Sequence, residues 1–405
     1  MDLDTSWMQP DEELTEQVIA WRRHLHMYPE LSFEEYETTE FIVQQLEAMG
    51  IAVERPTPTG AIGLLEGKGG PGPTIALRAD IDALPIQEAN TFPYRSQRDG
   101  VMHACGHDGH TAILLGTARL LAENRDRWPG RVKLLFQPAE EMNPGGAQPF
   151  IEAGVLEGVS SIIGLHLIGT VPYGTAGIRP GPMLANTGRF EIHIQGKAGH
   201  ASLPHQNIDA ALIAAQMLVN LQAIVSRQID PAQPAVLTVS KIEAGTTFGL
   251  VAGNAHLLGS LGSLGDDWRE KMVASLKRIA QHTAALYGAE AKVTYYPGIP
   301  ALVNDPGVAA VMAEAAEAVL GPGSVFEQRP VMVGDDFARY LQVVPGAYLF
   351  LSAKKPDQEE TVPHHHPRFD FDERALAKGV AIMTRAAVRL LTQGEGADDA
   401  RVASG

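Results

Sequence analysis

Apolar positions in the first part of the chain follow two alternating periods. Helical spacing occurs in three segments, 12–28, 34–49 and 111–124. Short apolar or β-branched runs, which indicate strands, lie at 51–54, 61–65, 74–79, 131–136 and 161–166. Alternation of helices and strands along a chain predicts an α/β sheet covered by helices. In such sheets the strand ends and helix starts usually hold the chemistry.

The pattern changes between residues 180 and 188, where Pro180, Gly181 and Pro182 interrupt it. Alternating apolar and polar residues then predict a strand at 190–196. A helix, two strands, a helix and a strand follow, at 207–228, 235–243, 255–262, 266–287 and 290–296. This β-α-β-β-α-β order predicts a compact ferredoxin-like domain inserted into the α/β domain.

After Pro297 a helix, a strand and a helix are predicted at 306–319, 346–352 and 373–392. The chain of 405 residues also exceeds the roughly 250–300 residues at which single cores stop growing. We therefore expect an α/β domain in two parts, 1–185 and 298–393, an inserted domain at 186–297, and a flexible tail at 394–405.

Charge narrows the class of partner. The chain carries 32 basic and 48 acidic residues, a formal net charge of −16 with histidine neutral. Such a charge repels phosphate backbones and anionic lipid, which disfavours binding to nucleic acid or to a membrane surface. Hydrophobic residues at 45% and charged residues at 20% are ordinary for a globular protein. A small-molecule partner is favoured.

The compartment is indicated by three features. No stretch approaches the ~18 consecutive apolar residues of a membrane span. The acidic N-terminus lacks the basic and then apolar plan of a signal peptide. The single cysteine cannot form an internal disulfide. The sequence therefore predicts a cytoplasmic protein.

Histidine is concentrated in two short segments. Six of the 14 histidines lie in 103–110 and 364–366. In the first segment Cys105 and His107 are two residues apart on a predicted loop, where a thiolate and an imidazole can meet one divalent ion. An isolated Cys-x-His is more often a small buried thiol beside a helix cap. A metal site therefore needs further ligands from elsewhere.

Two adjacent carboxylates, Glu140 and Glu141, follow the predicted strand 131–136. Neighbouring side chains diverge at a strand end, so one carboxylate can bind a metal while the other faces a metal-bound water. A solvated acidic turn is the alternative.

Two further histidines are candidate ligands. His166 ends the apolar run 161–165, which places it at the same edge of the sheet, although a lone histidine there is more often structural. His365 lies in a segment without helical or strand period, which is typical of a loop at a functional site.

Asp80 and Asp82 follow the predicted strand 74–79. Either carboxylate could orient a ligand histidine, or could instead form a structural ion pair. His200 lies on a polar loop of the inserted domain, without nearby acidic residues. That setting favours substrate contact or oxyanion stabilisation over metal binding, with a turn and helix cap as the alternative.

Three longer motifs combine these residues: His103-Ala-Cys-Gly-His-Asp-Gly-His110, Gln137-Pro-Ala-Glu-Glu141 and His365-His366-Pro367-Arg368-Phe369. In this order they resemble the M20 metallopeptidase and amidohydrolase family. The branch that they resemble contains hippurate hydrolase, N-acyl-amino-acid amidohydrolases and plant auxin-conjugate hydrolases. The resemblance covers nearly the whole chain, from Arg22 to Glu373.

The resemblance implies a metal-dependent exopeptidase-like catalytic domain with a ferredoxin-like α+β insert that serves as lid and dimerisation domain. It implies two divalent metal ions, zinc or manganese, with cobalt or nickel as alternatives. The implied metal ligands are Cys105, His107, Glu141, His166 and His365. A homodimer through the inserted domain is expected.

The resemblance also implies the reaction, hydrolysis of the amide bond of N-acyl or N-aroyl amino acids, such as hippurate-like conjugates. Glu140 would activate a metal-bridging water and then protonate the leaving amine. His200 would steady the oxyanion in the site of the other subunit of the dimer.

The insert departs from the family pattern at two places. Gly262 stands where the family commonly has the arginine of Gly-Thr-x-Arg-Thr. Asn254 is followed by Ala255 and His256, where Asn-Val-Ile-Pro is usual, and is retained as a candidate substrate contact. These departures predict an altered substrate pocket around an intact metal core.

Three other functions stay open. A dipeptidase or aminopeptidase of the same fold would need a pocket for a free α-amino group. An amidase with Cys105 as nucleophile would leave Glu140 and Glu141 without a role. A non-catalytic member would keep the fold as a metal- or ligand-binding module.

Overall fold

The computed structural model describes residues 5–356 and 360–392. They divide into two compact units. The large unit comprises the described residues of Met1–Gly181, Val303–Arg329 and Arg339–Gly405. The small unit comprises Pro182–Leu302 and Pro330–Ala338, so it contains a second segment in addition to the predicted insert. The predicted tail at 394–405 lies outside the described residues.

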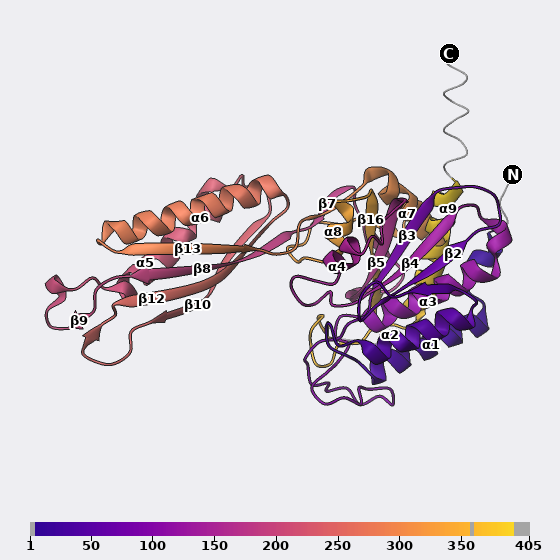
Figure 1. Ribbon diagram of the computed structural model, residues 1–405, viewed down its shortest axis with the longest axis horizontal. Helices are drawn as coiled ribbons and strands as arrows, with labels where there is room; N and C mark the ends of the chain where they lie inside the picture. Colours follow the sequence, from indigo (N-terminus) through magenta and orange to yellow (C-terminus); the bar gives the residue numbers. More distant parts are fainter. Residues whose placement is uncertain (1–4, 357–359, 393–405) are drawn as a thin grey trace, which may run out of the picture. The chain divides into compact units, whose positions relative to one another are not determined.

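A mixed eight-stranded sheet forms the centre of the large unit, in the order β1-β2-β4-β3-β5-β16-β6-β15 (Figure 1). Its strands are β1 (Ala52–Glu54), β2 (Ala61–Glu66), β3 (Thr74–Asp80), β4 (Arg131–Gln137), β5 (Val159–Pro172), β6 (Ala176–Ile178), β15 (Val325–Glu327) and β16 (Gly346–Lys354). β3 pairs in parallel with both β4 and β5, and β5 pairs in parallel with β16. The carboxyl ends of these four strands therefore share one edge of the sheet.

Helices cover this sheet: α1 (Glu12–Met27), α2 (Tyr36–Ala48), α3 (His107–Glu123), α4 (Ala147–Glu152), α7 (Pro306–Leu320) and α9 (Arg374–Thr392). α3 and α9 contact β3 and β5, α1 packs on α3 and α9, and α7 packs on α9 and β16 (Figure 1). The short helix α8 (Phe337–Leu341) crosses the boundary between the units.

The predicted start of α3 is wrong by one turn. The helix begins at His107, directly after Gly106, whose φ of 98° is accessible mainly to glycine. The second half of the His-rich motif is therefore helical, whereas the sequence predicted a loop. Gly109 inside this turn allows close packing, because a Cβ there would lie 2.5 Å from Leu167 Cδ1.

The small unit contains a four-stranded antiparallel sheet in the order β10-β12-β8-β13. In chain order its elements are β8 (Asn186–Gln195), α5 (Ala210–Leu221), β10 (Ala235–Ala244), β12 (Asn254–Ser263), α6 (Asp266–Leu286) and β13 (Glu290–Pro297). Alternate residues of β8, among them Phe190 and Ile192, pack into one apolar core with α5 and α6. The intervening residues of β8 form the opposite face of the sheet.

Helix α5 is shorter than predicted. Asp209 caps its start by accepting a hydrogen bond from Ala211 N, and a separate π-helical turn at Ile224–Gln228 follows its end. Ala210–Gln228 is the one segment of the described chain that is long and apolar enough to cross a membrane by length and composition. One side of it packs in the core of the small unit, and the other exposes Leu212 and Val219.

The remaining elements are short. They are the strands β7 (Gly181–Leu184), β9 (Gly199–His200), β11 (Leu250–Val251) and β14 (Leu302–Asn304), and the 3-10 turns Ser6–Met8, Arg125–Arg127 and Pro204–Gln206. Sequence periodicity did not predict them, because two to four residues are too few to show a period.

A buried ion cluster joins the helices of the large unit. The guanidinium of Arg22 in α1 donates hydrogen bonds to Asp108 in α3, at 2.8 Å, and to Asp370 before α9, at 2.9 Å. Burial opposes the charge of Arg22, but the two carboxylates outweigh that effect and raise its pKa. Asp108 also lies 2.8 Å from His26 Nδ1.

Replacing Arg22 by methionine leaves these carboxylates buried without their cation. We expect Arg22→Met to lower the free energy of unfolding by about 3–5 kcal/mol, measured by denaturant titration. Arg23→Met is the matched control: Arg23 pairs with Glu373 while 45% of its side chain is exposed, so its loss should change stability by less than ~1 kcal/mol. Equal effects of the two substitutions would contradict this assignment.

Candidate active site

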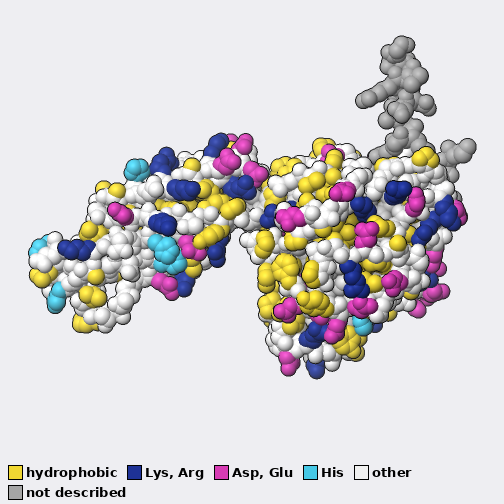
Figure 2. All heavy atoms as spheres, in the orientation of Figure 1, with side chains coloured by type: hydrophobic (Ala, Val, Ile, Leu, Met, Phe, Trp, Pro, Cys, Tyr) yellow, Lys and Arg dark blue, Asp and Glu magenta, His cyan; other side chains and the backbone are white. Residues whose placement is uncertain are grey.

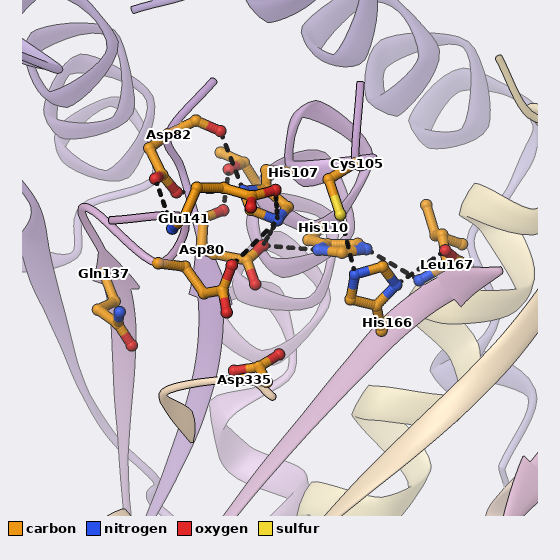
Figure 3. Close-up of polar contacts among 12 residues, drawn as sticks. Asp80, Asp82, Cys105, His107, His110, Gln137, Glu141, His166, Leu167 and Asp335 are labelled. Carbon is orange, nitrogen blue, oxygen red and sulfur yellow. Dashed lines mark hydrogen bonds and ion pairs between the residues drawn. The ribbon is translucent and has the colours of Figure 1, made fainter. Parts of the chain in front are cut away.

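One sheet edge of the large unit brings together residues that the sequence singled out, among them Asp80, Cys105, His107 and His166 (Figure 3). Asp80 ends β3, and Glu140 and Glu141 follow the end of β4. In the register of β3 and β5, Arg78 lies opposite Gly164, so His166 is level with Asp80. The sequence predicted His166 at a strand end, but β5 continues to Pro172 because it goes on pairing with β16 beyond His166. His166 is thus held on a paired strand.

The five predicted ligands lie in one cluster. Cys105 Sγ is 3.5 Å from His166 Nε2. Glu141 Oε1 is 3.9 Å from His107 Nε2 and 3.0 Å from His365 Nε2. The cluster thus combines one sulfur, three imidazole nitrogens and a carboxylate, all from the large unit.

Hydrogen bonds set the orientation of two of these imidazoles. His107 Nδ1 lies 3.0 Å from the backbone oxygen of Asp82 and 3.1 Å from its Oδ1, both of which are acceptors. His166 Nδ1 lies 2.9 Å from the backbone oxygen of Leu167. Each ring therefore carries a proton on Nδ1 and directs Nε2 into the cluster.

Donor chemistry in the cluster fits a divalent metal. His107 Nε2 is buried and has no hydrogen-bond partner among the described residues. A buried nitrogen without a partner is unfavourable unless a ligand completes it. Thiolate, imidazole and carboxylate together suit zinc and neighbouring transition metals. The residues present therefore fit the metal centre that the motifs imply.

Asp80 and Asp82 act on different histidines. Asp82 holds His107, and its Oδ2 also accepts a hydrogen bond from Glu141 N at 3.0 Å. Asp80 instead lies 2.6 Å from His110 Nδ1. Because His110 Nε2 accepts from Leu167 N, both nitrogens of His110 are occupied, and this residue supports β5 rather than offering a lone pair.

Of the three adjacent histidines, two reach the cluster. His365 Nε2 faces Glu141, while His364 Nδ1 lies 3.8 Å from Cys105 Sγ. Burial and the nearby His110 lower the pKa of His364 to about 4, so its ring is neutral at pH 7. His366 Nδ1 accepts a hydrogen bond from Arg368 N instead. The sequence offered no periodic signal that separates His364 from its neighbours.

Glu140, the predicted general base, lies beside the cluster. Only 9% of its side chain is exposed, and Oε2 is 4.0 Å from His107 Nε2. The backbone before it is unusual, because Ala139 has a φ of 52°, in the left-handed region.

Glu35, which the sequence analysis missed, holds this turn. Its Oε1 accepts a hydrogen bond from Ala139 N at 2.7 Å. The carboxyl group is buried, and burial together with the nearby Asp82 raises its pKa to about 7. A glutamate beside the start of a predicted helix resembles a solvated residue in sequence, so only the fold shows its partner 104 residues away.

The candidate residues of the insert belong to the small unit. His200 lies in β9 opposite Leu250, is exposed, and accepts a hydrogen bond at Nδ1 from Ser202 N. Asn254 is the exposed first residue of β12. At Gly262 a Cβ would lie 2.8 Å from the backbone oxygen of Asn186, so no side chain fits there without a backbone shift.

Comparison with known proteins gives consistent results. The model of peptidase family M20/M25/M40 matches residues 76–389. An N-acyl-L-amino acid amidohydrolase of Geobacillus stearothermophilus is 45% identical over 294 residues, covering 72% of this chain and 79% of that protein. An N-acetyl-L-cysteine deacetylase of Bacillus subtilis is 42% identical over 385 residues, covering 94% and 90%.

One solved structure is similar over almost its whole length. It is the YXEP protein of Bacillus subtilis, described as a dinuclear metal binding peptidase from the M20 family. The two chains are 37% identical with a TM-score of 0.84, over 94% of this chain and 99% of that one.

Glu35 gives a prediction with a defined pH dependence. Its folded pKa of about 7 lies above the usual 4.5, so its contribution to stability is present below pH ~4.5 and is lost as pH rises through 7. Between these limits the wild type should lose on the order of 3 kcal/mol relative to Glu35→Gln, measured by denaturant unfolding. Glu34→Gln, an exposed neighbour, should show no such difference. Parallel stability curves for wild type and Glu35→Gln would contradict the assignment.

Proposed function

Because this chain belongs to peptidase family M20/M25/M40, we propose that it hydrolyses the amide bond of N-acyl or N-aroyl amino acids. Family membership makes it an amidohydrolase or peptidase. The observation that carries the proposed chemistry is the convergence of Cys105, His107, Glu141, His166 and His365 beside Glu140. This arrangement supports a metal-binding donor set next to one carboxylate left for proton transfer.

Two divalent metal ions, zinc or manganese, are proposed to bind these five residues, with cobalt or nickel as alternatives. Bound there, they would polarise the scissile carbonyl and make water acidic enough to attack it. The thiolate and imidazole donors favour zinc, whereas the carboxylate also suits manganese.

In the proposed mechanism Glu140 moves the proton. Its carboxylate takes a proton from the attacking water and delivers it to the nitrogen of the leaving amine. Burial suits this role, because a nearly water-free carboxylate exchanges its proton with the substrate rather than with solvent. Asp82 keeps His107 in the tautomer that binds metal, and Glu35 holds the turn that aims Glu140.

We assign the small unit the role of a ferredoxin-like lid and dimerisation domain. Its exposed apolar side chains support a homodimer, with Leu212 and Val219 on α5, Phe248 just before β11 and Leu250 in β11. In that dimer His200, which is also exposed, would steady the oxyanion in the site of the other subunit. A dimer interface also accounts for the apolar outer side of α5 without a membrane.

The substrate class follows from relatives and from the insert. Two relatives carry names of enzymes that act on N-acetylcysteine and on N-acyl-L-amino acids. Gly262 stands where resemblance to the family leads one to expect an arginine, and it has no side chain to contact the substrate. Recognition of the amino-acid part of the substrate must therefore use other groups, with Asn254 as our candidate. A cytoplasmic location suits a site whose single cysteine must stay reduced.

The test is hydrolysis of a panel of acetyl, benzoyl, indole-acetyl and aminobenzoyl amino acids, with added zinc or manganese. We expect turnover of at least one conjugate, loss of activity with a chelator, and recovery with metal. If unmodified dipeptides, tested beside the panel, are cleaved and none of the acyl amino acids is, a dipeptidase is favoured. Activity that survives full metal removal would favour an amidase with Cys105 as nucleophile. Absence of turnover on the whole panel would favour a non-catalytic protein that binds metal or ligand.

Glu140→Gln tests the assignment of the general base. This isosteric change should lower kcat by about 10²–10⁴-fold while leaving the bound metal and the melting temperature unchanged. Glu47→Gln, an exposed substitution on α2, is the control and should retain wild-type kcat. Full activity of Glu140→Gln would sink the proposed mechanism.

A further inference from the structure

The outer face of the small unit's sheet carries a row of four polar side chains. Glu243 lies opposite His256, His256 opposite His193, and His193 opposite Lys292. The row thus crosses all four strands, from β10 through β12 and β8 to β13. Figure 2 shows histidine side chains gathered beside acidic ones on the visible face of this unit.

Two of these histidines and a glutamate converge. The rings of His193 and His256 stack with centroids 4.1 Å apart and planes inclined by 11°. Glu191 lies two residues before His193 in β8, so it shares the same face. Its Oε2 is 3.7 Å from His193 Nε2 and 3.8 Å from His256 Nε2. Two imidazole nitrogens therefore point to one carboxylate oxygen.

A carboxylate faces each ring nitrogen of His256. Glu243 Oε2 lies 4.0 Å from Nδ1, and Glu191 Oε2 lies 3.8 Å from Nε2. His256 Nε2 is buried and has no hydrogen-bond partner among the described residues. A buried nitrogen without a partner is unfavourable unless a ligand completes it, so this atom indicates a ligand position beside Glu191.

We propose that Glu191, His193 and His256 bind a zinc ion on the outer face of the small unit. Tetrahedral ligands at ~2.1 Å from zinc are ~3.4 Å apart, so the observed spacings of 3.7 and 3.8 Å need to contract by only a few tenths of an ångström. One imidazole must also turn out of the stack, because the in-plane lone pairs of two nearly parallel rings do not meet at one ion. Two imidazoles disfavour magnesium and calcium, which prefer oxygen ligands.

The surroundings leave room for this ion. His193, His256 and Glu243, but not Glu191, line a surface hollow of about 510 Å³, so water reaches the two imidazoles from that side. Glu290 also lines it, and its charge offsets that of Lys292. The other lysine nearby, Lys241, is paired with Glu243 at 2.7 Å.

This site is distinct from the proposed catalytic centre. The three ligands all belong to the small unit and share no residue with the donor set of the large unit. Zinc bound here would link the two central strands of the sheet, β8 and β12, through side chains on its exposed face.

Equilibrium dialysis of the full-length protein against a series of zinc concentrations tests the site. The metal-free wild type is compared with the double variant His193→Gln/His256→Gln, and bound zinc is measured by mass spectrometry. We expect a binding step of one zinc ion per chain in the wild type that is absent from the double variant. Superimposable isotherms would overturn the proposal.

Controls separate this ion from the catalytic metals. His282→Gln, which removes an exposed histidine of α6, should keep the wild-type isotherm. Glu191→Gln should weaken the additional step without abolishing the two imidazole contacts. Hydrolysis by Glu191→Gln should be unchanged when the catalytic metals are supplied. If His282→Gln removes the same step, the binding is non-specific and the proposal fails.

Discussion

The buried contact between Arg22 and Asp108 is the constraint on which the candidate site depends. Asp108 lies one residue after His107 in the first turn of α3, so its position fixes the start of that helix. Removing two charges from water is unfavourable unless each gains several partners. Arg22 contacts three carboxylates and Asp108 also contacts His26, which meets that requirement and joins α1, α3 and the segment before α9.

The sheet supplies the other half of the arrangement. Parallel pairing of β3 with β4 and β5 brings Asp82, Glu141 and His166 to one edge, although they are far apart in the chain. Polar groups at that edge then orient one another: Asp82 holds His107 and the amide of Glu141. Hydrogen bonds within the protein thus hold the donor atoms in position, which lowers the cost of ordering them around a ligand.

Short-range patterns in the sequence predicted the strands that precede the site and the residue types that could bind a metal. Strand periodicity predicted the segments 74–79 and 131–136, which precede Asp80 and Glu140, and the resemblance of the motifs implied the donor residues. Long-range partners did not appear in the sequence: Arg22 and Asp108 are 86 residues apart, and Glu35 reaches Ala139. For the same reason His166 was predicted at a strand end, since only pairing with β16 extends β5 beyond it. His364 entered the cluster unpredicted, because three adjacent histidines carry no period that shows their directions.

The most direct test of the central claim is an anomalous-difference map from crystals of the protein grown with zinc. Two strong peaks are expected in the large unit, within the cluster of Cys105, His107, Glu141, His166 and His365. Absence of any peak beside Cys105 and His107, or zinc bound in the large unit only by other side chains, would contradict it.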